Sequence, residues 1–324
     1  MEKAAQNQPS PLALVLAASL AEVFFSWGYG AASAYPLRER IWGLGLALLG
    51  FWGLLALLSG RRPGGRRLYG ALAGAAVLLA LMRTLKEGWR FYTLYADEDS
   101  DLLIFGALAL LAAGWGVYWG ERAAYRAGSV ALWLAAGEGV LVLFSLAGQC
   151  RITNLPDEPI EAGALAGAAG SALFFLPELL YWAEKEGRRP GFLAQSGRYL
   201  GTIWAAQSLL WVLAALIWQE EGGAFDAARL GLLSVFRRFD ILYMPVLLLL
   251  FYSRLVLGAL WLARLRRRLG LPGSCLWWAG GLTLAGSAFL YSGSPENYLR
   301  GGEQALLWLA AVLYLMGPKT KKTG

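Results

Sequence analysis

The sequence predicts an all-α polytopic membrane protein with about ten transmembrane helices. Of its 324 residues, 57% are hydrophobic and only 16% are charged, whereas soluble domains carry about 25% charged residues. Apolar segments follow one another along almost the whole chain, and most are close to the roughly 20 residues that a helix needs to cross a bilayer. The basic residues between them fall on alternating sides, as in chains that cross the membrane repeatedly.

The expected spans form two sets of five. The first set is Leu12–Ala32, Ile41–Leu58, Tyr69–Tyr92, Leu102–Trp119 and Ala127–Ala147, and the second is Gly163–Trp182, Leu200–Trp218, Ile241–Leu262, Cys275–Tyr291 and Ala305–Met316. Together they predict a single transmembrane domain, 1–324, with short tails at 1–10 and 318–324.

Charge orients the chain, because lysine and arginine are retained on the cytoplasmic side. With a cytoplasmic N-terminus, the inner segments contain basic clusters at 61–67, 122–126, 185–198, 264–268 and 319–322. The outer segments contain only Arg38, Arg40, Arg151, Arg229, Arg237, Arg238 and Arg300. Both termini are therefore expected in the cytoplasm, and Cys150 and Cys275 should lie on opposite faces, too far apart to pair.

Composition also limits the chemistry. The net charge of +7 follows from the basic inner loops, so we expect contact with anionic lipids and no nucleic-acid partner. Histidine is absent, which removes His-based acid–base catalysis, Ser–His triads and His metal sites. We expect neither an enzyme nor a cofactor.

The five-plus-five division indicates an inverted repeat, with repeat one at about 11–148 and repeat two at about 162–317. In LeuT-like transporters of this plan, the binding site lies where helices 1 and 6 are broken. The corresponding positions here contain Ser26, Trp27, Gly28, Tyr29 and Gly30 in the first span, and Gly163, Gly167, Gly170, Ser171 and Pro177 in the sixth. The alternative is that these glycines only let helices pack closely.

Several charges fall inside the expected spans. Glu22, Glu138 and Glu178 are the candidates for a functional carboxylate, because a lone charge at the bilayer centre costs roughly 2.5–3.5 kcal/mol and normally pairs or faces water. Arg83, Lys86 and Arg90 share one helix face. Arg254 lies at a depth similar to that of Glu178, so we expect the two to pair or to share a polar cavity. Arg90 and Asp240 lie close enough to the interface to reach it without a function.

Four stretches resemble the B subunit of spore germinant receptors, the GerAB-type permeases of the amino acid–polyamine–organocation superfamily. They are Tyr118–Arg126, Ile152–Pro156, Phe174–Glu178 and Arg237–Asp240. The first is similar to the family's Gly-Glu-Arg tract before helix five, and the second to its Asn-Leu-Leu-Pro loop. The third is similar to its Phe-Pro-Phe-Gly-Glu in helix six, and the fourth to its Glu-Arg-Leu-Asp. The first span departs from the family, with Ser26–Gly30 in place of a Gly, apolar residues and Pro.

The resemblance implies a germinant-sensing subunit in the spore inner membrane, with an A-type subunit and a C-type lipoprotein as partners. An amino acid or nucleoside would lie between spans 1, 3, 6 and 8. The helix ends near Gly28–Gly30 and Gly170–Ser171 would contact its polar groups, Trp27 or Tyr29 would cover it, and Arg83 would face a carboxylate.

Two alternatives remain open. An ion-coupled amino-acid transporter would need a titrating carboxylate, for which Glu138 is the first candidate and Glu22 the second. A ligand-free scaffold would only hold other subunits.

Overall fold

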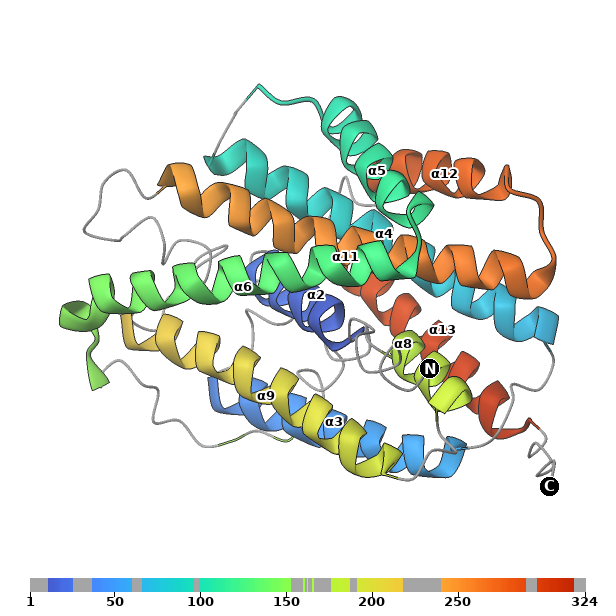
Figure 1. Cartoon of the computed structure of the whole chain (residues 1–324), viewed down its shortest axis with the longest axis horizontal. Helices are drawn as coiled ribbons and strands as arrows, with labels where there is room; N and C mark the ends of the chain where they lie inside the picture. Colours follow the sequence, from blue (N-terminus) through green and yellow to red (C-terminus); the bar gives the residue numbers. More distant parts are fainter. Residues whose placement is uncertain are drawn as a thin grey trace, which may run out of the picture. The chain divides into compact units, whose positions relative to one another are not determined.

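The computed structural model describes residues 11–25, 37–59, 66–95, 99–152, 160, 162, 165, 176–186, 191–217, 240–289 and 296–317. Within these ranges the structure is helical and contains no strand. The helices are α2 (Pro11–Phe25), α3 (Leu37–Leu58), α4 (Arg66–Tyr95), α5 (Leu102–Tyr118), α6 (Glu121–Leu146), the 3₁₀ turn η1 (Ala147–Gln149), α8 (Leu176–Glu186), α9 (Phe192–Ile217), α11 (Asp240–Leu269), α12 (Cys275–Phe289) and α13 (Glu296–Leu315). Each α-helix overlaps one expected span, which confirms the all-α prediction (Figure 1).

Length and hydropathy make this a polytopic membrane protein. Three helices are long and apolar enough to cross a bilayer, at Leu37–Leu58, Arg67–Thr93 and Tyr243–Leu269, and shorter apolar helices lie at Leu12–Ala21, Leu102–Tyr118 and Gly302–Leu315. Many large apolar side chains are exposed on the protein surface, among them Trp133, Phe144, Trp277 and Trp278. A soluble protein rarely exposes so much apolar surface, whereas a bilayer would cover it.

The chain divides into two compact units, and each draws residues from both halves of the sequence. Unit 1 comprises 1–33, 83–157 and 206–260, and unit 2 comprises 34–82, 158–205 and 261–324. Helices α4, α9 and α11 each contribute residues to both units. The inverted repeat stays a prediction. Cys150 and Cys275 are both free cysteines.

In unit 1, most of α2 is buried, and the helix lies beside α6 (Figure 1). The helices approach closely at Gly128, where an added Cβ would lie 2.5 Å from the Leu14 Cα, so no other residue fits there without a shift. The amide of Gln207 on α9 donates a hydrogen bond to the carbonyl oxygen of Ser19 at 2.8 Å. These contacts hold α2, a largely apolar helix, inside unit 1.

Helices α4, α5 and α11 meet around an aromatic cluster in unit 1. The ring of Phe105 lies 5.3 Å from Tyr92 and 5.8 Å from Phe251, measured between centroids. Gly88 on α4 faces the Phe251 ring so closely that a Cβ would overlap it. The Tyr252 hydroxyl also donates to the carbonyl oxygen of Ala112 at 3.2 Å. This packing fixes the faces that α4 and α11 present to each other.

In unit 2, α3 and α9 run antiparallel (Figure 1). The Trp52 indole donates to the carbonyl oxygen of Leu193 at 2.9 Å, and the Trp204 indole donates to that of Ile41 at 3.0 Å. The start of α9 is therefore tied to the second half of α3, and the start of α3 to the middle of α9. Opposite directions for these two helices agree with the alternating topology predicted from charge.

Candidate functional site

The predicted site residues fall into three groups. Ser26, Trp27, Gly28, Tyr29, Gly30, Gly163, Gly167, Gly170 and Ser171 lie outside the described residues, and so do Thr153, Asn154, Leu155 and Pro156 of the second stretch that resembles the GerAB-type permeases. Glu22 is in α2 and Asp240 begins α11, but their side chains are not described. Arg83, Glu138, Glu178 and Arg254 are described and buried. The candidate site consists of this last group and its neighbours.

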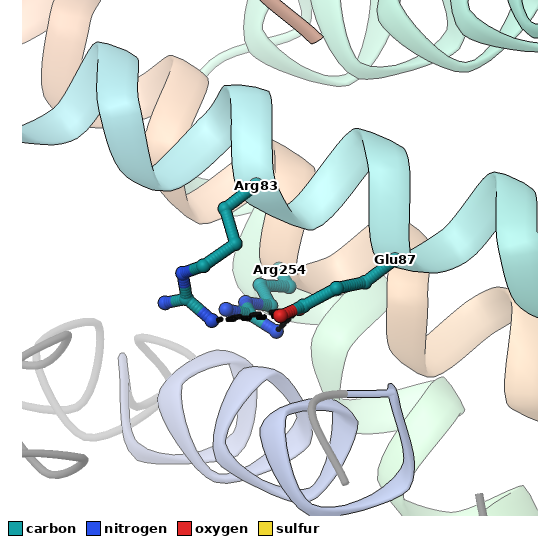
Figure 2. Close-up of polar contacts among 3 residues, drawn as sticks. All are labelled: Arg83, Glu87 and Arg254. Atoms are coloured by element: carbon teal, nitrogen blue, oxygen red, sulfur yellow. Dashed lines mark hydrogen bonds and ion pairs between the residues drawn. The ribbon is translucent and has the colours of Figure 1, made fainter. Parts of the chain in front are cut away.

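Two arginines converge on one carboxylate in unit 1. The Arg83 Nη1 lies 3.2 Å from Glu87 Oε1, and the Arg254 Nη1 lies 3.4 Å from Glu87 Oε2. Figure 2 shows both guanidinium groups directed at the same carboxylate from two helices, α4 and α11. The side chains of Arg83, Glu87 and Arg254 are 6%, 14% and 0% exposed.

The local sequence explains this geometry. Arg83 and Glu87 are four residues apart on α4, so their side chains share a face one turn apart. Gly88 lets the Phe251 ring approach α4, and Arg254 follows Phe251 by three residues, which brings it to the same face of α11. The Lys86 ammonium lies 4.5 Å from the centre of the Trp89 ring, a cation–π contact that places further positive charge on this turn.

These three side chains carry more positive than negative charge. Arg83, Glu87 and Arg254 together sum to one net positive charge at neutral pH. Guanidinium groups bind carboxylates through paired, charge-assisted hydrogen bonds, and each guanidinium has five N–H donors to offer. Buried arginines at this depth are therefore candidates for contact with the carboxylate of a small anionic or zwitterionic molecule.

Glu178 has a different partner from the one that the sequence suggested. In unit 2 its Oε2 lies 2.6 Å from Arg264 Nη1 and accepts a hydrogen bond from the Trp261 indole at 2.9 Å. The Arg264 guanidinium also lies 3.9 Å from the centre of the Tyr181 ring. Within unit 1, Arg254 contacts Glu87. The expectation that Glu178 and Arg254 pair or share a polar cavity stays a prediction.

Arg264 was not considered as a partner of Glu178 because the helix that carries it was expected to end too early. The eighth span was expected to stop at Leu262, which put Arg264 in a cytoplasmic segment, but α11 continues to Leu269. Arg264 is therefore a helical residue that faces α8. Glu87 was missed as well, although its spacing from Arg83 was the signal that could have identified an ion pair within α4.

Glu138 is a buried carboxylate without an ion pair in the described structure. It lies in α6 and is 7% exposed, and its Oε1 has no hydrogen-bond partner among the described residues. Ala131 and Val142, at helical spacing from it, are buried too. Within the part of the chain that the structure describes, no group of three Asp, Glu, Cys or His side chains could hold a metal ion.

Comparisons with known proteins give a likeness at the level of structure. No protein-family model and no curated protein matches the chain. Among solved structures, it is similar to a transporter of the nucleobase-cation-symport-1 family in a closed conformation with bromovinylhydantoin bound, at 13% sequence identity and a TM-score of 0.40. The match covers 95% of this chain and 72% of the transporter.

Proposed function

We propose that this chain is a permease-like membrane subunit that binds the carboxylate of a small nutrient at Arg83, Glu87 and Arg254. One observation carries the proposal: two buried guanidinium groups share a single carboxylate on helices long enough to cross the membrane. Charged groups at membrane depth are expensive, and an intramembrane ionisable residue is by default a candidate for a substrate or ion site.

The chemistry of the two arginines suggests the ligand class. Guanidinium groups carry a fixed positive charge and bind carboxylates through paired, charge-assisted hydrogen bonds. In a region where water screens little, a ligand that carries a carboxylate interacts with them more strongly than a neutral one. An amino acid or another small carboxylate therefore fits better than a neutral nucleoside, which has no charge to contribute.

Sensing is the role we favour for this site. The four stretches that resemble GerAB-type permeases support a germinant receptor in the spore inner membrane, with an A-type subunit and a C-type lipoprotein as partners. Bound nutrient would stabilise one arrangement of the helices and so shift the population towards the state that signals. An ion-coupled transporter would use the same site but would also release the nutrient on the other side.

Binding to the purified chain tests the site. A panel of labelled amino acids and nucleosides would be offered to the protein in lipid nanodiscs, and the dissociation constant measured for each that binds. Replacing one charge-assisted partner should cost about 1.5–3 kcal/mol, so Arg83→Gln should weaken binding of a carboxylate nutrient by roughly 10- to 100-fold. Arg151→Gln, at an exposed arginine in unit 1, is the matched control and should bind normally.

The outcomes separate the candidate functions. Equal affinity of wild type and Arg83→Gln would refute the site, and no saturable binding by wild type would favour the scaffold. Arg83→Lys keeps the charge but loses the paired hydrogen-bond geometry, so it should bind with intermediate affinity. It replaces Arg83→Gln as the test if the Gln variant does not fold. Proteoliposomes then distinguish a sensor, which binds without accumulating nutrient, from a transporter, which accumulates it when an ion gradient is imposed.

A further inference from the structure

Glu138 is a buried carboxylate that the nutrient site does not use. Only 7% of its surface is exposed. It makes no ion pair in the described part of the chain, and its Oε1 accepts no hydrogen bond there. Gly137 and Gly139 flank it, and neither can contribute a polar side chain. An ionised carboxylate in this position would lack the compensation that buried charges normally require.

The elements packed against α6 do not supply a counter-charge within their described side chains. The elements in the most extensive contact with α6 are α2, α5 and η1. Across these three elements the titratable residues are Tyr118, at the end of α5, and Glu22, whose side chain is not described. On α6 itself, Glu121, Arg122, Tyr125 and Arg126 lie in the first two turns, roughly 18 Å or more from Glu138 along the axis.

A proton is the ligand that suits these surroundings. Binding H⁺ turns the carboxylate into a neutral carboxylic acid, and it needs no other ligand. A sodium or calcium ion would need several further oxygen ligands, but the buried neighbours at helical spacing on α6 are Ala131 and Val142. The surroundings therefore suit a neutral acid better than a metal carboxylate.

We infer that Glu138 is a proton-binding site within the membrane-spanning part of the protein. Its carboxylate takes up one proton to become the acid and releases the same proton to become the carboxylate again. This inference does not rest on the proposed nutrient site.

Carbodiimide labelling tests it directly. Dicyclohexylcarbodiimide enters apolar regions and adds to protonated carboxyl groups, and peptide mass spectrometry measures the labelled fraction of each residue. For wild-type protein in nanodiscs, we expect labelling of Glu138 at about pH 5 that falls at least about tenfold by pH 9, where carboxylic acids are normally ionised. Glu121, at the first turn of the same helix, is the internal control and should take little label.

Each outcome has one meaning. No label on Glu138 at any pH, or label on Glu22 in its place, would overturn the inference, and so would protection of Glu138 by sodium at constant pH. Infrared spectra provide a second measurement: the carbonyl band of a protonated carboxyl should be present in wild type and absent in Glu138→Gln. Neither readout requires a nutrient, so a failed nutrient-binding experiment leaves this test intact.

Discussion

The ion pair between Glu178 and Arg264 should be the strongest polar link between α8 and α11 in unit 2. The two side chains are 6% and 7% exposed, and their charged atoms lie 2.6 Å apart. Further along the same two helices, Arg268 pairs with Glu184 at 2.5 Å, but these side chains are 27% exposed for the glutamate and 21% for the arginine. The chain thus provides a buried pair and a more exposed control pair on the same two helices.

Removing one partner of the buried pair should destabilise the fold by roughly 3–5 kcal/mol, because a lone buried charge remains. The two single changes should differ. Glu178→Gln leaves Arg264 stacked on Tyr181, a cation–π contact worth about 2 kcal/mol when water is excluded, and the Gln oxygen can still accept from Trp261. Arg264→Gln leaves the Glu178 carboxylate with the Trp261 indole as its donor, so it should cost more.

A double-mutant cycle measures the coupling. Unfolding in mixed micelles with increasing sodium dodecyl sulfate, followed by far-ultraviolet circular dichroism, gives the free energy of unfolding for wild type, both single variants and the double variant. We expect the double variant to lose clearly less than the two singles together, with a coupling energy of about 2–3 kcal/mol. The matched cycle on Glu184 and Arg268 should give about 1 kcal/mol or less. Additive effects at Glu178 and Arg264, or equal coupling in both cycles, would refute the reasoning.

Two further predictions concern packing and orientation. Gly88→Ala should destabilise the protein by about 1–3 kcal/mol, because the added Cβ overlaps the buried Phe251 ring. The control Gly114→Ala has open space around it and should be neutral or stabilise the protein by up to about 1 kcal/mol. The same unfolding assay compares the two variants, and equal losses of stability would contradict the packing. In a protein with Cys150 and Cys275 replaced by serine, a membrane-impermeant thiol reagent added outside should label a cysteine at Asp99 and spare cysteines at Arg62 and Arg267. The reverse labelling pattern would show that the predicted orientation in the membrane is inverted.

The existence of the helices could be predicted from the sequence because the bilayer imposes a simple requirement. Each helix must satisfy its own backbone hydrogen bonds and present roughly 20 apolar residues to lipid, so a run such as Ile41–Leu58 identifies the helix α3 without knowledge of its neighbours. Helix ends are less determined. Arg264, Arg266, Arg267 and Arg268 are polar enough to resemble a loop, but they continue α11, since arginines can remain helical while their charged ends reach water or an acidic partner.

Partners of buried charges could not be predicted from depth, and α4 and α11 show why. Depth in the membrane alone is compatible with a pair between Glu178 and any basic residue at a similar depth, and Arg254 was the residue considered. What decides the pairing is which faces meet. In unit 2, Gly70 faces Leu269 and Gly74 faces Leu265, so a step forward along α4 is matched by a step back along α11. In unit 1, Gly88 faces Phe251.

That antiparallel register places Arg254 within a turn of the position opposite Glu87, so the partner follows once α4 and α11 are known to pack together. The same logic distinguishes Glu138 from Glu87 and Glu178. The latter two lie on helices that pack against α11, the helix that carries Arg254 and Arg264, and each acid takes one of these arginines. Glu138 lies on α6, whose neighbours α2 and α5 have no basic residue in their described lengths. A carboxylate that the fold places away from the arginines of α4 and α11 has a proton as its simplest means of losing its charge, and this is the physical reason for expecting Glu138 to behave differently from the other two.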